Sequence, residues 1–271
     1  MVVAHSCSAA PAIRGDILPQ QDNGTNLDVI VIGGGPAGST VSTLLARKGW
    51  RVGLLEKDRH PRFHIGESLL PWNNPIFERL GILHDVARIG VPKFAADFTL
   101  PHSPEFTRVD FSKALPPTPP SAFQVRRAEF DHLLLRKAAE GGVAVAEETR
   151  AVGVDLDCAG RVKVDALSGD GVPSTWSSRF LIDASGRDTF LGRHLDIKRR
   201  HPKHRSAAMY GHFEGVEQRR GRDAGNISVY WFRHGWIWMI PLSRGVTSVG
   251  VVAQPSYFQD REAVASAIDD A

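Results

Sequence analysis

A glycine-rich turn between a buried strand and an amphipathic helix constrains the fold of this chain more than any other feature. The strand is Asp28–Ile32, an almost uninterrupted β-branched run of the kind that is buried on both faces of a parallel sheet. The turn at Gly33–Gly38 follows directly, and the apolar spacing in Ser39–Lys48 predicts a helix that ends at a glycine. A second buried strand, Val52–Glu56, completes a β–α–β unit. The folded part of the chain therefore begins as an α/β domain.

The glycines of this turn have the spacing that a dinucleotide diphosphate requires. Gly33 permits the tight turn, Gly35 lets the diphosphate approach the backbone, and Gly38 lets the helix pack closely on the strand. The helix N-terminus offers free N–H groups and a partial positive charge to the anion. Glu56 can hydrogen-bond a ribose hydroxyl, and its charge disfavours the 2′-phosphate of NADP. FAD and NAD both remain open on these residues alone. The predicted contacts here are Gly33, Gly34, Gly35, Ala37, Gly38, Ser39 and Glu56.

The composition is that of a soluble globular enzyme, with 42% apolar and 23% charged residues. A formal charge of +3 without a sustained basic stripe argues against a nucleic-acid partner. Because the chain has neither a secretory signal nor a run of about 18 apolar residues, we expect a cytoplasmic protein without a membrane segment. Cys7 and Cys158 are predicted to be free thiols. His60 and His64 have no metal-ligand spacing, so packing or a cofactor contact is preferred and no metal site is predicted.

The remaining patterns predict the domain organisation. We expect a disordered leader over residues 1–26, a nucleotide-binding domain over 27–200 with substrate-side segments around 84–125, and part of an antiparallel domain over 201–271. Three strand-like runs between Ala151 and Ile182 predict an antiparallel meander. Helices are expected at 76–80, 128–140 and 261–268, a strand at 143–146, and further strands at 227–232, 236–240 and 247–252. The basic segment at 198–205 is predicted to be a solvated loop; the alternative is docking of an anionic partner such as a phosphopantetheine carrier.

Two further motifs favour FAD over NAD through a family resemblance. Arg127–Asp131 resembles the R-x-x-F-D helix start of flavin monooxygenases of the hydroxybenzoate-hydroxylase fold, and Asp183–Gly186 resembles their D-A-S-G motif. The resemblance implies that Arg127 contacts FAD and that Asp183 lies near its ribose and diphosphate. It also implies a fold class: an α/β, Rossmann-like FAD-binding domain of the hydroxybenzoate-hydroxylase and glutathione-reductase type, with an inserted meander and a partial antiparallel substrate-domain sheet.

Two other segments resemble flavin-dependent halogenases of the tryptophan halogenase type. Gly66–Pro71 has the pattern G-E-S-x-x-P, and Trp236–Pro241 has the complete pattern W-x-W-x-I-P. Strand alternation places the two indoles on one face, where the resemblance implies a wall that keeps organic substrate away from the flavin. An aromatic-rich core strand is the alternative. The cofactor contacts implied by the first motif are Ile65, Glu67 and Ser68, and the residues implied for the partition are Trp236, Trp238, Ile240 and Pro241.

The resemblance also implies a reaction and a catalytic residue. In this family reduced FAD, supplied by a separate flavin reductase, reacts with oxygen and halide to give hypohalous acid. A lysine then halogenates an electron-rich aromatic or pyrrole-type substrate, either a small molecule or one bound to a carrier protein. The family's lysine lies in a context like K-(aromatic)-G-x-x-F, which Lys93–Phe98 matches with Ala95 in place of the glycine. Lys93 is therefore the catalytic candidate, and a solvent-facing lysine is the alternative.

The resemblance extends from about Leu27 to Phe258. Because the family's sequence continues beyond this region, we expect a C-terminally truncated chain whose own activity is doubtful. The alternative functions are a flavin hydroxylase, a geranylgeranyl-reductase-like oxidoreductase, or an inactive FAD-binding remnant.

Overall fold

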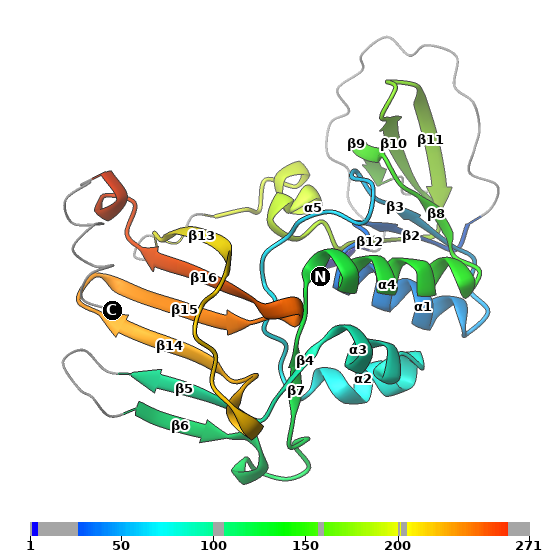
Figure 1. The fold of residues 1–271 in the computed structure, drawn as a ribbon. Helices are drawn as coiled ribbons and strands as arrows, with labels where there is room; N and C mark the ends of the chain where they lie inside the picture. Colours follow the sequence, from blue (N-terminus) through cyan, green and yellow to red (C-terminus); the bar gives the residue numbers. More distant parts are fainter. Residues whose placement is uncertain are drawn as a thin grey trace. The chain divides into compact units, whose positions relative to one another are not determined.

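The computed structural model of this chain describes residues 2–4, 27–99, 106–156, 160–199, 201 and 205–259 (Figure 1). The chain divides into two compact units: unit 1 comprises Met1–His64 and Ala128–Arg199, and unit 2 comprises Ile65–Arg127 and Arg200–Ala271. The predicted substrate-side segment around residues 84–125 belongs to unit 2. The two cysteines, the predicted helix at 261–268, residues 200 and 202–204 of the basic segment, and most of the predicted leader lie outside the described residues.

Unit 1 is built on a five-stranded sheet. The strand order is β1 (Val2–Ala4), β12 (Phe180–Asp183), β2 (Val29–Ile32), β3 (Val52–Leu55) and β8 (Ala144–Ala146). The last four strands run parallel, and β1 pairs antiparallel with β12 at one edge. Both central strands, β2 and β3, are buried along their whole length, as their uninterrupted apolar sequences predict.

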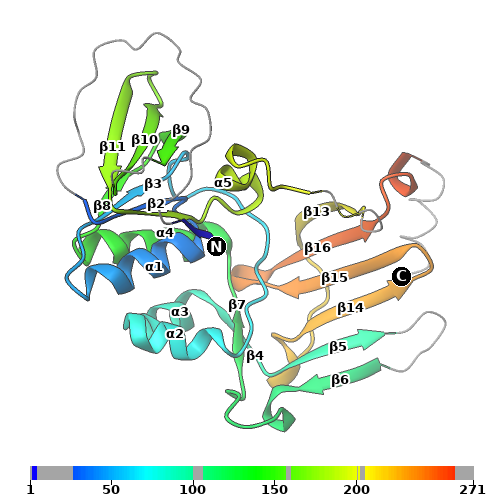
Figure 2. The ribbon, with the colours of Figure 1, turned by 180° about the vertical axis from the view of Figure 1, so that it is seen from behind.

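Two different layers cover the faces of this sheet (Figures 1 and 2). Helices α1 (Pro36–Ala46) and α4 (Arg127–Glu140) lie side by side on one face, where their apolar residues share a core with β2 and β3. The other face packs against an antiparallel meander of β9 (Thr149–Leu156), β10 (Val162–Ser168) and β11 (Pro173–Ser178). Unit 1 is thus a three-layer domain in which the carboxyl ends of β2 and β12 meet beside the glycine turn.

Unit 2 is built on a six-stranded sheet. Its neighbouring pairs are antiparallel except for β14 and β5, which run parallel. The strand order is β13 (Ala207–Glu214), β16 (Val246–Ala253), β15 (Gly235–Pro241), β14 (Ile227–Phe232), β5 (Ala95–Thr99) and β6 (Phe106–Asp110).

Unit 2 also contains a two-stranded sheet, formed by β4 (Val91–Lys93) and β7 (Ala122–Gln124). Its described α-helices are α2 (Asn73–Leu80) and α3 (Leu83–Ile89). Ser68 forms an isolated bridge to Gln124, so the Gly66–Pro71 segment runs beside β7. The short helices of the two units are η1 (Phe111–Lys113), η2 (Gly186–Asp188), α5 (Phe190–His194), η3 (Gly221–Asp223), η4 (Ser243–Gly245) and η5 (Tyr257–Gln259).

The structure confirms the predicted fold class and corrects three details. The last run of the predicted meander divides into two strands: β11 belongs to the meander, whereas β12 leaves it and pairs parallel with β2. Residues 2–4, which we expected in a disordered leader, form the edge strand β1. The substrate-domain sheet is mixed rather than purely antiparallel, because β5 arrives from a distant part of the chain and adds parallel to β14.

Candidate functional site

The glycine turn of unit 1 has the geometry that a diphosphate site needs. Gly33 has φ +105°, and a Cβ there would lie 2.4 Å from the carbonyl oxygen of Ala184. A Cβ on Gly38 would lie 1.8 Å from the carbonyl oxygen of Gly33, so the helix can pack here only without one. In contrast, a Cβ on Gly35 would meet no atom within 4 Å. No side chain caps the first turn of α1 among the described residues, which leaves its N–H groups available to an anion.

Two buried carboxylates lie at the ends of the strands beside this turn, and Glu56 bonds to it directly. Glu56 Oε2 accepts a hydrogen bond from Gly34 N at 2.5 Å, and its Oε1 accepts one from Asp58 N at 2.8 Å. Asp183 accepts from Ser185 N and Leu191 N at 2.9 and 2.8 Å, one with each oxygen. Both residues stand at the carboxyl ends of parallel strands, β3 and β12, on either side of β2. The structure therefore brings Glu56 and Asp183 to the glycine turn, and their contacts with a ribose remain a prediction.

Arg127 fixes the segment that leads into the G-E-S motif in unit 2. Its Nη1 donates to the carbonyl oxygen of Ile65 at 2.7 Å and to that of Gly66 at 3.4 Å. Gly66 has φ +104°, a conformation that glycine adopts without strain. The predicted flavin contacts Arg127 and Ile65 thus touch each other, and Arg127 sets the course of the chain into Glu67.

Lys93, the predicted catalytic residue, is buried rather than solvent-facing. Its exposed fraction is 1%, and its Nζ donates to Ser68 Oγ at 2.5 Å. The ammonium also lies 5.7 Å from the centre of the Phe111 ring. No carboxylate forms an ion pair with Lys93 in the part of the chain that the structure describes. Burial without a countercharge lowers the pKa of Lys93 from 10.5 to about 8.

This lowered pKa makes the stability of the chain depend on pH. Between pH 8 and 10.5 the folded state loses the Lys93 proton while the unfolded state keeps it. The free energy of unfolding is therefore lowest below pH 8 and rises by about 3 kcal/mol as the pH increases to 10.5. Urea denaturation of the chain and of Lys93→Met across this range measures the rise as a difference between the two proteins. A difference that stays constant with pH would show that Lys93 titrates normally.

The tryptophan motif forms β15, and its side chains alternate between the two faces of the sheet. Trp238 and Ile240 are buried in a cluster that includes Ile65 and Trp236. The ring centres of the two indoles are 5.7 Å apart, with an interplanar angle of 47°. Met239 and Pro241 line a polar hollow of about 240 Å³ on the opposite face. The structure thus places Ile65, from the segment preceding the G-E-S motif, against the tryptophan face.

Two residues that the sequence motifs do not include contact Glu67. His212 Nε2 lies 2.7 Å from Glu67 Oε1, and Ser248 Oγ donates to Glu67 Oε2 at 3.2 Å. The indole N–H of Trp238 donates to the same Ser248 Oγ at 3.1 Å. Neither His212 nor Ser248 belongs to a motif, and no spacing connects them with Glu67. His60, in turn, is buried, and desolvation lowers the pKa of its imidazole.

Comparison with known families shows which cofactor the chain binds. Residues 26–266 match the family described as the FAD binding domain. The chain belongs to this FAD-binding family. The prediction of FAD over NAD is therefore confirmed, and the features of the turn fit the cofactor: open space at Gly35 and uncapped N–H groups on α1 suit its diphosphate.

Curated relatives of this FAD-binding chain are halogenases. A flavin-dependent halogenase of Armillaria mellea is 37% identical over 238 residues, which cover 83% of this chain and 46% of that protein. A 1H-pyrrole-2-carbonyl-(peptidyl-carrier protein) chlorinase of Pseudomonas fluorescens is 29% identical, over 87% of this chain and 57% of that protein. The chain thus spans about half the length of these relatives. The predicted resemblance to flavin-dependent halogenases is confirmed.

Solved structures agree on the fold. The flavin-dependent halogenase CmlS superposes with a TM-score of 0.81 at 35% identity, covering 90% of this chain and 44% of that one. A flavoprotein/dehydrogenase from Cytophaga hutchinsonii superposes with a TM-score of 0.82 at 31% identity, covering 90% of this chain and 61% of that one. Within the described residues, no helix is long and apolar enough to cross a membrane, and no group of three or more metal-binding side chains gathers.

Proposed function

We propose that this chain carries the FAD site and the reactive lysine of a flavin-dependent halogenase. The observation that carries the proposal is the state of Lys93: a buried amine, 1% exposed, hydrogen-bonded to Ser68 and with its pKa lowered to about 8. A lysine kept only for solubility would lie in water with an ordinary pKa. The names of the curated relatives, which are flavin-dependent halogenases and a chlorinase, support the same reaction.

The FAD-contacting residues act through shape and charge. The N–H groups at the start of α1 hold the diphosphate, and Gly35 gives it access to the backbone. Glu56 holds the turn and is placed for a sugar hydroxyl. When bound, reduced FAD supplies the electrons with which oxygen and halide yield hypohalous acid. The partly buried indole of Trp236, backed by the buried Trp238, is the apolar wall that excludes organic substrate from the oxidising side.

Lys93 directs the halogen to carbon. With its pKa at about 8, roughly a tenth of the amine is neutral at pH 7, so both protonation states are accessible. The neutral amine attacks the halogen of hypohalous acid, forming a haloamine and releasing water. An electron-rich ring carbon then takes the halogen, loses its proton and restores the amine. In its ammonium form Lys93 instead donates a hydrogen bond to the hypohalous oxygen, which makes the halogen more electrophilic. Ser68 keeps Nζ in place in both forms.

The substrate is an electron-rich aromatic or pyrrole-type ring. We propose a small molecule or a carrier-bound acyl group, since one relative is a chlorinase of a pyrrole on a peptidyl-carrier protein. The other partners are a separate flavin reductase, oxygen and a halide. The match to a flavoprotein/dehydrogenase favours a second candidate, an oxidoreductase of the same fold that takes electrons from NAD(P)H directly.

The source of electrons separates the two candidates. We expect no oxidation of NADH or NADPH by the FAD-loaded chain alone, because the nucleotide turn is assigned to FAD and Glu56 disfavours NADP there. Oxygen consumption should begin when an added flavin reductase supplies reduced FAD. Absorbance of the nicotinamide measures NAD(P)H oxidation without the reductase, and an oxygen electrode measures oxygen consumption with it. Substrate-stimulated NAD(P)H oxidation without the reductase would favour the second candidate.

A further inference from the structure

Glu67 stands at the centre of a hydrogen-bond relay inside unit 2. Its exposed fraction is 0%, and each carboxylate oxygen meets a different partner. Oε1 lies 2.7 Å from His212 Nε2, and Oε2 accepts from Ser248 Oγ at 3.2 Å. Ser248 Oγ lies 3.1 Å from the indole nitrogen of Trp238. One chain of contacts therefore connects the G-E-S motif with the tryptophan motif.

The chemistry of the groups sets the direction of this relay. An indole nitrogen only donates, so Ser248 Oγ must accept from Trp238. The single proton of the serine hydroxyl is then left for Glu67 Oε2. A carboxylate only accepts, so His212 holds its proton on Nε2 when it meets Oε1. Both oxygens of Glu67 are thus used by protein donors.

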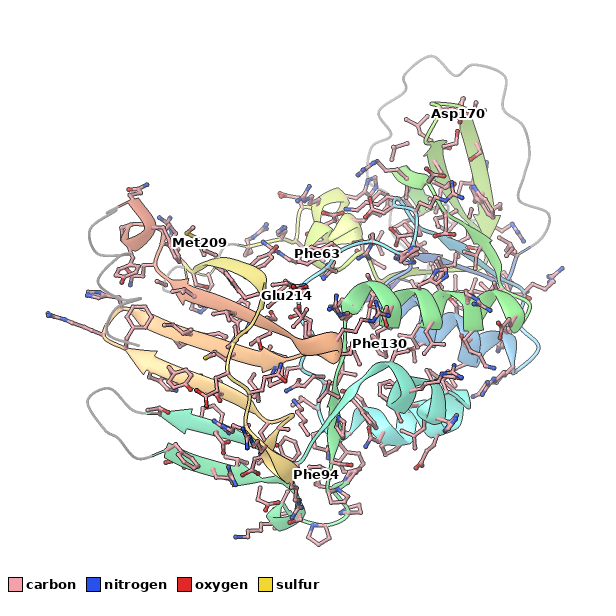
Figure 3. All side chains as sticks on the ribbon, in the orientation of Figure 1. Phe63, Phe94, Phe130, Asp170, Met209 and Glu214 are labelled. Atoms are coloured by element: carbon pink, nitrogen blue, oxygen red, sulfur yellow. The ribbon has the colours of Figure 1, made fainter. Side chains whose placement is uncertain are left out.

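The Trp238 ring is held on its other sides by packing. Gly250 is its partner on β16, and a Cβ there would lie 2.1 Å from the indole ring, so the ring occupies the space above this glycine. Tyr210 stacks on the indole, with ring centres 6.3 Å apart. Tyr210 and His212 both belong to β13, the strand that carries the labelled residues Met209 and Glu214 in Figure 3. The relay therefore adds a directional contact to the packing of Gly250 and Tyr210 against the ring.

We propose that Glu67 is a positioning residue for the Trp238 indole, acting through Ser248, and not a ligand of the cofactor as the sequence resemblance implies. The significance of a fixed indole for halogenation rests on the proposed function, but the relay itself does not. Consecutive residues of one segment then serve two purposes: Glu67 orients the tryptophan wall, and Ser68 holds Lys93. This division explains why an acidic residue and a hydroxyl residue stand side by side.

NMR of the chain labelled with ¹⁵N-tryptophan tests this proposal without any turnover. The chain has six tryptophans, and Trp238→Phe identifies the indole N–H signal of Trp238. We expect Ser248→Ala to shift this signal upfield through loss of its acceptor. Glu67→Met should shift it too, because Ser248 loses the group that orients its hydroxyl. In the Ser248→Ala background, Glu67→Met should add no further shift.

Ser228→Ala is the matched control, since Ser228 is a buried serine of the same sheet whose hydroxyl meets Arg219 instead. It should leave the Trp238 signal unchanged. An equal effect of Glu67→Met in both backgrounds would overturn the relay, as would no effect in either. If Ser248→Ala shifted all six indole signals equally, Ser248 would stabilise the sheet in general, and its proposed role toward Trp238 would be wrong. If Glu67→Met weakened FAD binding but left the Trp238 signal unmoved, Glu67 would be a cofactor contact and not a positioning residue for Trp238.

Discussion

Replacing Lys93 by alanine is expected to abolish halogenated product while the oxidation of reduced FAD continues. The amine is the group that we propose to carry the halogen to carbon, whereas the FAD contacts that we propose lie on other residues. Removing a positioned acid–base or nucleophilic group typically lowers turnover by about 10²- to 10⁴-fold. Liquid chromatography with mass detection measures the product, and an oxygen electrode measures flavin oxidation in the same sample. Lys93→Arg separates the two proposed routes: product is lost if the neutral amine carries the halogen, because a guanidinium cannot lose its proton, and is retained if a hydrogen bond to hypohalous acid suffices.

Lys113→Ala is the control for this experiment. Lys113 lies in η1 of the same unit and is exposed, so its loss removes the same charge without touching the buried site. Its product yield should equal that of the unchanged chain. Product from Lys93→Ala at the level of Lys113→Ala would remove Lys93 from the mechanism.

Replacing Gly35 by alanine is expected to weaken FAD binding without weakening the fold. A Cβ at Gly35 meets no protein atom within 4 Å, and its backbone conformation is open to any residue, so the FAD-free chain should unfold at the same temperature. The methyl group would instead occupy space that the diphosphate needs. Crowding of this kind costs about 1–3 kcal/mol, which corresponds to an affinity roughly 5- to 150-fold lower. Flavin fluorescence titration measures the affinity.

Two other glycines complete this test. Gly38→Ala should lower both FAD affinity and the unfolding temperature, because its Cβ would lie 1.8 Å from the carbonyl oxygen of Gly33. Gly192→Ala, in α5 of the same unit, should alter neither, since its nearest neighbour would be an ordinary 3.5 Å away. Unchanged FAD affinity in Gly35→Ala would place the diphosphate elsewhere.

Much of unit 1 could be predicted because its signals are local. The β-branched run Asp28–Ile32 predicts β2, which begins one residue later at Val29, and the predicted strand Val52–Glu56 corresponds to β3. Helix α1 begins at Pro36, three residues before the predicted start, because proline suits the first helical position and lets the turn lead directly into the helix. Strand alternation also correctly separates Trp238 from Met239.

The parts that could not be predicted depend on contacts between distant residues. The parallel pairing of β14 with β5 joins Ile227 to Ala96, and nothing in either strand's own sequence encodes it. Glu67 is 145 residues from His212 and 181 from Ser248. Histidine and serine are common on strands, so neither residue is distinguishable before the fold brings it to Glu67. The burial of Lys93 likewise follows from tertiary packing. A lysine in a loop-like sequence can be buried or exposed, and the local sequence does not decide between the two.

Bromine incorporation tests the central claim most directly. The FAD-loaded chain, supplied with a flavin reductase, NADH, oxygen, bromide and an electron-rich phenol or pyrrole, should give a product whose mass spectrum shows the isotope doublet of bromine. The doublet should disappear in Lys93→Ala. Hydroxylated product without bromine would contradict the account and indicate a monooxygenase. FAD binding with no turnover of any donor would contradict it as well, and would indicate a chain that holds the cofactor without catalysing a reaction.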